Sequence, residues 1–272
     1  MMQDILVHMD GSASCTLRLD VAISLAKRFK TRLIGLFAQT ETDSSSVVAR
    51  RASDRLQAAA AQASALFHQR AEAAGLTTLW WQLSHGETGH VVAESAFCAR
   101  YADLVVLGQW HQQGATVPDD FIEQVVLQCG RPVLVIPHVG AGPTLGERIS
   151  VAWNASREAS RALHDALPFL QQAKEVNILA IRESGPTSSP TDVPKVDIVE
   201  HLTARGINTK AERLTAEGIG IMDMLLSRTF DLGSDLLVMG AHSGMALGFG
   251  QRRGSGTHFI LHHLTTPVLM SN

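Results

Sequence analysis

The sequence has few of the features that mark secreted, membrane or nucleic-acid-binding proteins. Its 272 residues include three cysteines, Cys15, Cys98 and Cys129, without CxxC spacing, which favours small core residues in a reducing compartment over a disulfide framework. The formal net charge of -3 gives the whole chain no attraction for nucleic acid or anionic lipid. No apolar run is long enough to span a bilayer, and no basic and then apolar leader precedes the first strand pattern. These absences predict a soluble, cytoplasmic protein.

Signatures of common catalytic and nucleotide-binding classes are also missing. No Ser or Cys stands on a GxSxG elbow and no paired carboxylates flank a predicted pocket, so we expect no catalytic residues. Neither GxxxxGK[ST] nor a GxGxxG after the first strand is present. His258 and His262 have a spacing that zinc sites use, but no carboxylate or cysteine accompanies them, so we expect no metal site in the protein.

The sequence does contain a repeated α/β pattern. Asp-Leu-Val-Val-Leu-Gly at 103–108 and Pro-Val-Leu-Val-Ile at 132–136 recur as Asp-Leu-Leu-Val-Met-Gly at 235–240 and Pro-Val-Leu-Met at 267–270. Short strand-like runs alternate with helical patterns in both halves, which is typical of βα units around a parallel sheet. Such internal similarity predicts a duplicated fold.

The openings of the two halves align as well, Ile-Leu-Val-His-Met-Asp-Gly-Ser at 5–12 with Ile-Ser-Val-Ala-Trp-Asn-Ala-Ser at 149–156. A stretch with three glycines and a proline, 138–147, has linker composition and separates domains at 1–138 and 147–272. Strands are predicted at 4–9, 32–38, 77–83, 104–108, 132–136, 149–153, 176–181, 208–213, 236–240 and 267–270. Helices are predicted at 13–29, 47–74, 89–101, 119–128, 157–170, 193–205, 220–230 and 255–263.

Two adjacent tryptophans, Trp80 and Trp81, lie within the strand predicted at 77–83. Because successive side chains of a strand point to opposite faces, the two indoles face opposite sides of the sheet. We expect one indole in the core and the other at an interface.

A glycine-rich segment fills 240–257 in the second half, and the first half has no equivalent. Its glycines allow the backbone to approach a ligand closely. Gly254-Ser-Gly-Thr257 then begins a predicted helix, whose free amides and dipole favour an anion, and Arg252 and Arg253 add positive charge. In open parallel sheets, ligands bind outside the carboxyl ends of strands where connections leave to opposite faces. The segment and the end of the first strand, at Asn154, are therefore predicted to form a phosphate cradle.

These residues resemble the universal stress protein family, whose ATP-binding members carry GxxG, nine residues and then G[ST], with an Asp after the first strand. The resemblance covers nearly the whole chain and is that of two such domains in tandem. It implies two repeated five-stranded parallel-sheet domains of an α/β, Rossmann-like, adenine nucleotide alpha hydrolase-like fold. It also implies that the halves pair about a pseudo-two-fold axis through their final strands, in place of the dimer of single-domain relatives.

The two halves depart from the family pattern in complementary ways. In the second half Gly244 follows Gly240 after three residues rather than two, and Asn154 stands at the Asp position, where an amide keeps an acceptor but loses the charge. In the first half Asp10 matches the family, but no G[ST] pair follows, and Asp119 and Asp120 at the next helix start would repel a phosphate. We expect the first half not to bind ATP.

The resemblance implies a stress-response protein that holds ATP, with Mg²⁺, in its C-terminal domain as a regulatory ligand. Adenine would contact backbone near Ala152 and Ile181, and ribose would contact Asn154. Phosphates would contact residues of the glycine-rich segment and the helix after it: Gly240, Gly244, Gly254, Ser255, Gly256 and Thr257. His242, inside the segment, either donates to a phosphate or packs against the segment.

Two other interpretations stay open. One is a scaffold with the same fold that binds no nucleotide, or that binds another small anion in its place. A homodimer is also possible. The other is a slow ATPase, although the sequence shows no base to activate water.

Overall fold

The computed structural model describes residues 2–41, 52–183, 196–216, 218–241 and 255–272. It divides into two compact units, unit 1 with Met1–Ala141 and Met270–Asn272, and unit 2 with Gly142–Leu269. Each unit has its own α/β core of buried aliphatic and aromatic side chains.

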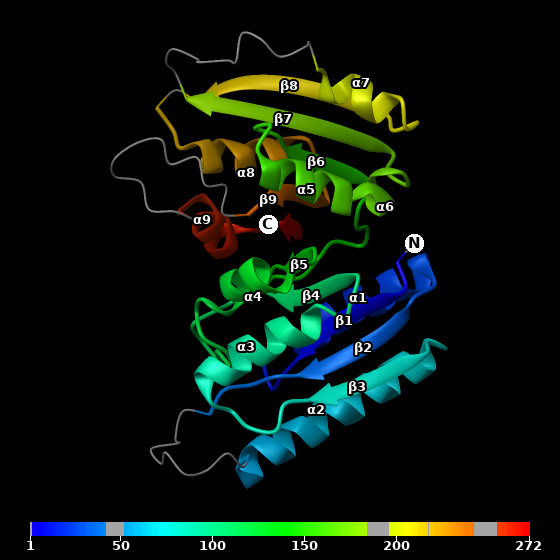
Figure 1. Cartoon of the computed structure of the whole chain (residues 1–272), viewed down its shortest axis with the longest axis vertical. Coiled ribbons are helices and arrows are strands. Elements are labelled where there is room, and N and C mark those ends of the chain that lie inside the picture. The colour runs from blue at the N-terminus through cyan, green and yellow to red at the C-terminus, as the bar shows by residue number, and fades with distance from the viewer. Residues whose placement is uncertain (1, 42–51, 184–195, 217, 242–254) are drawn as a thin grey trace. The chain divides into compact units, whose positions relative to one another are not determined.

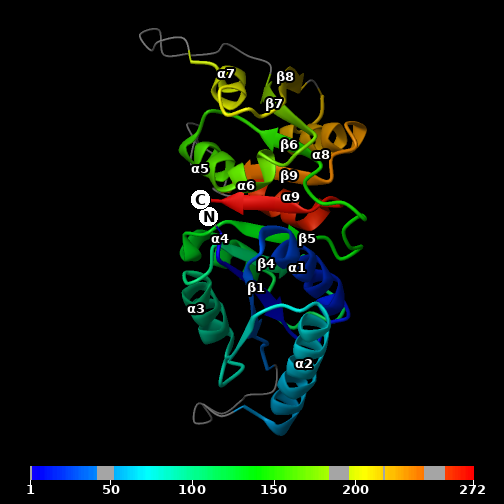
Figure 2. The same cartoon turned by 90° about the vertical axis from the view of Figure 1, so that its right-hand side faces the viewer.

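Unit 1 is a parallel sheet covered by helices. Strand order in this unit is β3-β2-β1-β4-β5, and the adjacent strands run parallel. Helices α1 and α2 lie on one face of this sheet, and α3 and α4 lie on the other (Figures 1 and 2). The elements are β1 (Asp4–Met9), α1 (Cys15–Phe29), β2 (Arg32–Phe37), α2 (Asp54–Ala73), β3 (Thr78–Gln82), α3 (Thr88–Ala99), β4 (Leu104–Gly108), α4 (Phe121–Cys129) and β5 (Val133–Ile136).

Unit 2 repeats this arrangement. Its strands follow the order β9-β6-β7-β8, with β10 next to β9, and β6 pairs in parallel with both β7 and β9. The elements are β6 (Arg148–Ala152), α5 (Arg157–Asp165), α6 (Leu167–Leu170), β7 (Glu175–Glu183), α7 (Ile198–Thr203), β8 (Thr209–Ala216), α8 (Ile221–Asp231), β9 (Leu236–Gly240), α9 (Ser255–His263) and β10 (Val268–Ser271).

The strand order places one switch point in each unit. The connection after β1 leads outward to β2, whereas β4 lies on the other side of β1, so the crossovers leave this pair of strands in opposite directions. The same holds for β6 and β9 in unit 2. The carboxyl ends of β1 and β4, and of β6 and β9, are therefore where this class of sheet holds ligands.

The repeated aspartate before β4 and β9 has a structural role. The Asp103 carboxylate accepts hydrogen bonds from the amides of Gln3 and Asp4, at 2.7 and 3.1 Å. The Asp235 carboxylate accepts from Gly146, Glu147 and Arg148 at 2.9 to 3.1 Å. Each aspartate thus satisfies backbone donors where the neighbouring first strand begins, which explains why both copies carry it.

All ten predicted strands are confirmed, and the helices differ mainly at their ends. The helix predicted at 47–74 begins at Asp54, because extended Ser53 caps it by accepting from the Leu56 amide; 47–51 lie outside the described residues. The helix predicted at 157–170 is divided into α5 and α6, with Pro168 in the first turn of the second. Within the helix predicted at 193–205, α7 begins at Ile198, because Asp197 caps it; 193–195 lie outside the described residues.

Candidate functional site

The same turn follows the first strand of both units. In unit 1, Asp10 Oδ1 accepts a hydrogen bond from the Ser12 amide at 3.0 Å. In unit 2, Asn154 Oδ1 accepts from the Ser156 amide at the same distance. This side-chain turn is one that Asp and Asn form equally well, so the exchange of one for the other keeps the backbone and changes only the chemistry of the outer side-chain atom.

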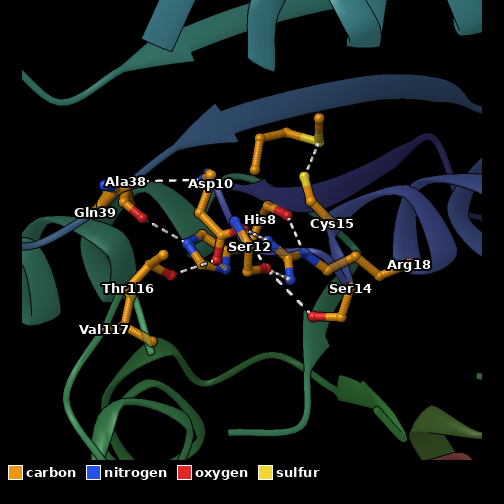
Figure 3. Close-up of polar contacts among 12 residues, drawn as sticks. His8, Asp10, Ser12, Ser14, Cys15, Arg18, Ala38, Gln39, Thr116 and Val117 are labelled. Carbon is orange, nitrogen blue, oxygen red and sulfur yellow. Dashed lines mark hydrogen bonds and ion pairs between the residues drawn. The ribbon is translucent and has the colours of Figure 1, made fainter. Parts of the chain in front are cut away.

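In unit 1 the carboxylate of Asp10 is fully engaged by the protein itself (Figure 3). Arg18 Nη2 lies 2.5 Å from Asp10 Oδ1, and both side chains are 3% exposed. Ser12 Oγ donates to Oδ1 at 2.6 Å, and Thr116 Oγ1 donates to Oδ2 at 2.6 Å. Asp10 therefore has no acceptor position left that a bound ribose or base would find open to solvent.

Arg18 and His8 complete this buried group, which we call the Asp10 cluster: His8, Asp10, Ser12, Arg18 and Thr116. Arg18 Nε donates to the His8 carbonyl at 2.5 Å, and His8 Nε2 lies 2.7 Å from the Ala38 carbonyl. His8 Nδ1 is 4.0 Å from Asp10 Oδ2. A buried ion pair needs hydrogen bonds to its remaining donors and acceptors, and in the cluster these are made by Arg18 Nε, Arg18 Nη1 and the two carboxylate oxygens of Asp10.

The cluster shifts the pKa values of its members in ways that fix their charges. Burial, and then the Arg18 charge, lower the pKa of His8 to about 4, so this imidazole is neutral at pH 7. Burial alone would raise the pKa of Asp10, but Arg18, His8 and the hydrogen bonds from Ser12 and Thr116 hold it well below its usual range. The Asp10 carboxylate is therefore ionised beside the Arg18 guanidinium.

Arg18 also fills the space beside the end of β4. A Cβ placed on Gly108 would lie 2.8 Å from Arg18 Nη1, so this side chain occupies the junction of β1 and β4. The switch point of unit 1 is closed by the protein's own guanidinium.

The residues at the equivalent positions of unit 2 cannot form this closure. The alignment of Ile5 with Ile149 pairs His8 with Ala152 and Arg18 with Ala162. Ala162 is fully buried on α5, as Arg18 is buried on α1, but its methyl group cannot reach a strand end. The cation and the imidazole of the Asp10 cluster are thus both replaced by alanine.

Asn154 is exposed where Asp10 is buried. Within the part of the chain that the structure describes, its Oδ1 accepts from Ser156 and its Nδ2 has no protein acceptor. This amide nitrogen is a hydrogen-bond donor at the carboxyl end of β6, beside β9.

Gly240 ends β9 directly against the first turn of α5. A Cβ at this position would lie 2.5 Å from the Ala159 amide nitrogen and 2.5 Å from the Glu158 carbonyl carbon. Only glycine allows the strand end and the helix start to approach this closely, because both contacts are to backbone. The structure therefore brings Asn154 and Gly240 to neighbouring strand ends.

The other predicted site residues lie in several places. Ala152 ends β6, and its register partner in β7 is Leu179. Ile181 lies in β7, two positions beyond Leu179. Gly256 is packed against Met222 of α8, since a Cβ there would lie 3.1 Å from Met222 Cε, and Thr257 is buried. Ser255 begins α9. His242, Gly244 and Gly254 lie outside the described residues.

Comparison with known proteins identifies the family. Residues 1–137 match the universal stress protein family. The chain belongs to this family. No relative was found among curated proteins.

Solved structures show how widely the universal stress protein fold extends over this chain. A universal stress protein from Archaeoglobus fulgidus DSM 4304 is 18% identical, covers 99% of this chain and 96% of its own, and superimposes with a TM-score of 0.73. A functionally unknown protein from Pseudomonas aeruginosa PAO1 is 16% identical, covers 99% and 92% of the two chains, and has a TM-score of 0.64. At these identities the likeness establishes the α/β, Rossmann-like fold.

Two classes of feature are not found among the described residues. No helix there is long and apolar enough to cross a membrane. In the same ranges no group of three or more His, Cys, Asp or Glu side chains is arranged to hold a metal ion. The His258 and His262 rings lie 4.2 Å apart and are tilted by 51° to each other.

Sequence reasoning missed the role of Arg18, although one signal was present. The buried face of α1 comprises Cys15, Leu19, Ala22 and Ala26, and Arg18 falls on that face by helical spacing. A charged residue at a core position requires a buried counter-ion. Thr116, the third partner of Asp10, is 106 residues away and gave no sequence signal.

Proposed function

We propose that this universal stress protein is a cytoplasmic tandem of two five-stranded domains, of which only unit 2 binds ATP. In this proposal unit 1 is a structural or regulatory partner, and the units pair about a pseudo-two-fold axis through their final strands. The observation that carries the proposal is the replacement of Arg18 by Ala162 and of Asp10 by Asn154 at equivalent switch points.

The described residues of unit 2 fit a nucleotide. Asn154 offers an exposed amide donor to a ribose or a base, and among the described residues no guanidinium or imidazole takes the place that Arg18 and His8 have in unit 1. Gly240 removes a side chain from the point where β9 meets α5. A carboxylate at position 154 would repel a phosphate, and the neutral amide of Asn154 does not.

The proposed contacts divide the ligand into three parts. Backbone near Ala152 and Ile181 would hold adenine, and Asn154 would hold ribose. Phosphates would be held by Gly240, the glycine-rich segment with His242, Gly244 and Gly254, and the α9 start at Ser255, Gly256 and Thr257, where helix amides and the dipole favour anions. Mg²⁺ would be held by phosphate and water oxygens.

The proposed role of ATP is regulatory rather than catalytic. A ligand that binds the folded unit 2 stabilises it and biases the conformation that a partner meets, by an amount set by its differential affinity. No described group near Asn154 and Gly240 is a base poised to activate water; Glu158 in the adjacent turn is ion-paired with Arg157 at 3.2 Å.

Thermal unfolding with and without Mg-ATP tests this proposal. At about a hundred times the dissociation constant, ATP should stabilise unit 2 by about 2.7 kcal/mol. Asn154→Ala removes the free donor and should weaken binding about tenfold, the value of one hydrogen bond. Asn208→Ala, an exposed asparagine on the far side of β7, is the matched control and should bind ATP like the parent protein.

Two results would count against nucleotide binding in unit 2. One is the absence of any ATP-dependent stabilisation in the parent protein, which would favour the scaffold interpretation. The other is equal stabilisation of the parent and Asn154→Ala, which would place the ligand elsewhere.

A further inference from the structure

Strand β3 is the last strand of the unit 1 sheet (Figure 1), and within the described residues the main-chain groups on its outer edge have no partner. The Leu33 amide donates to the Thr77 carbonyl at 2.9 Å, and the Leu83 amide donates to the Phe37 carbonyl at 3.1 Å. In a parallel pair, alternate residues of a strand bond to the same neighbour. Residues 77, 79, 81 and 83 therefore face β2, and the N–H and C=O groups of Thr78, Trp80 and Gln82 point outward.

This edge lacks the protection that exposed edges usually have. Natural sheets blunt such edges with charged residues, prolines or bulges. The sequence from Ala73 to Ser84 contains neither a charged residue nor a proline. The corresponding edge strand of unit 2, β8, carries Lys210, Glu212 and Arg213. The edge strand of unit 2 is therefore charged, whereas the edge strand of unit 1 is uncharged and contains two tryptophans.

We propose that β3 is a homodimer interface, in which two copies of this chain pair their β3 strands antiparallel about a two-fold axis. This inference concerns unit 1 and does not depend on nucleotide binding. A self-pairing surface must be complementary to itself, and an uncharged strand meets its own copy without like-charge repulsion.

One register satisfies all of the outward main-chain groups. With Trp80 opposite its own copy, Thr78 lies opposite the partner's Gln82, and each opposed pair exchanges two hydrogen bonds. The same register places Leu79 opposite the partner's Trp81 as a non-hydrogen-bonded pair, where side chains approach most closely. Leu79 is 37% exposed and Trp81 is half-buried, so this pairing covers apolar surface that the monomer leaves in water.

Helix α2 is compatible with this arrangement. Trp80 packs between Phe67 of α2, at a ring distance of 5.4 Å, and Gly35 of β2, which fixes α2 over the β3 side of the sheet. A two-fold axis normal to the joined sheet places both copies of α2 on the same face. Between Arg55 and Arg70 the exposed residues of α2 are alanine and glutamine, which are small or neutral: Gln57, Ala58, Ala61, Gln62, Ala65 and Gln69.

Sedimentation equilibrium of the full-length chain, from low micromolar to submillimolar concentration, tests the interface. The parent protein should approach twice the chain mass of 29.3 kDa. Leu79→Lys places a charge opposite the partner's Trp81 and should raise the dimer dissociation constant at least about tenfold. Gln82→Pro removes an amide donor that points away from β2, so it should also dissociate the dimer while leaving the unit 1 sheet intact.

The matched control is Ala211→Lys, an exposed edge residue of β8, which should leave association unchanged. Circular dichroism and urea midpoints establish that each variant is folded. A parent protein that remains at the monomer mass overturns the proposal. The β3 edge would then be available for pairing with an extended segment of another protein. A dimer that survives both Leu79→Lys and Gln82→Pro also overturns it, because the copies then associate through another surface.

Discussion

Replacing Arg18 with alanine is expected to lower the free energy of unfolding of unit 1 by about 3–5 kcal/mol, measured by chemical denaturation. The change leaves the Asp10 carboxylate buried without its counter-ion and opens a space beside Gly108. Breaking one side of a buried ion pair has this cost because the remaining charge has neither water nor a partner.

Two further variants make this result specific to the Asp10 cluster. Arg70→Ala breaks an ion pair of similar length with Asp20, 2.9 Å, but both side chains are nearly half exposed, so the loss should stay within about 1 kcal/mol. Arg18→Ala combined with Asp10→Asn reproduces the residues of unit 2 and should recover much of the loss, since no charge is then left unpaired. Equal effects of Arg18→Ala and Arg70→Ala would contradict the assignment of a buried cluster.

The stability of unit 1 is expected to fall by about 3 kcal/mol between pH 7 and pH 4 because of His8 alone. The pKa of His8 is lowered from 6.5 to about 4, mainly by burial, so in this range the unfolded chain takes up a proton that the native protein does not. Stability therefore rises with pH from about 4 to 6.5 and is level above it. Arg18 and Asp10 are the charged groups that face His8, and the lowered pKa of Asp10 keeps this carboxylate ionised across this range.

The measurement is a series of urea unfolding curves across pH 4–7 for the parent protein and His8→Gln. The glutamine keeps a donor for the Ala38 carbonyl but cannot titrate, so the slope should flatten. His111→Gln, at an exposed position of the same unit, should keep the pH slope of the parent protein. The pKa of Asp10 is also lowered, so the contribution of Asp10 to stability is present above pH 3.8 and is lost only at more acid pH. A His8→Gln slope equal to that of the parent would show that the ring is not buried in its neutral form.

The sequence predicted the elements of the fold more fully than it predicted their polar contacts. Strands such as Leu104–Gly108 and Leu236–Gly240 were predicted to the residue because a short apolar run follows an aspartate and ends in glycine. The start of α2 was not predicted because no proline or glycine interrupts residues 47–53, whereas the hydrogen bond from the Leu56 amide to Ser53 Oγ sets the boundary.

At the candidate site, pattern alone distinguished the halves but did not explain how unit 1 is closed. The expectation of no ATP in unit 1 was based on the missing G[ST] pair and on Asp119 and Asp120, which are exposed in the structure and form no side-chain cap of α4. The closure lies instead in Arg18, and it depends on a tertiary contact between α1, the β1 end and Thr116 that no local pattern records.

Isothermal titration of the nucleotide-free, full-length chain with Mg-ATP measures the number of sites directly. One molecule bound per chain is the predicted result, because Arg18 closes the switch point of unit 1 whereas no described side chain takes its place beside Asn154 in unit 2. Two molecules per chain would show that the Asp10 cluster does not exclude nucleotide, and no binding at all would show that unit 2 is not a nucleotide site.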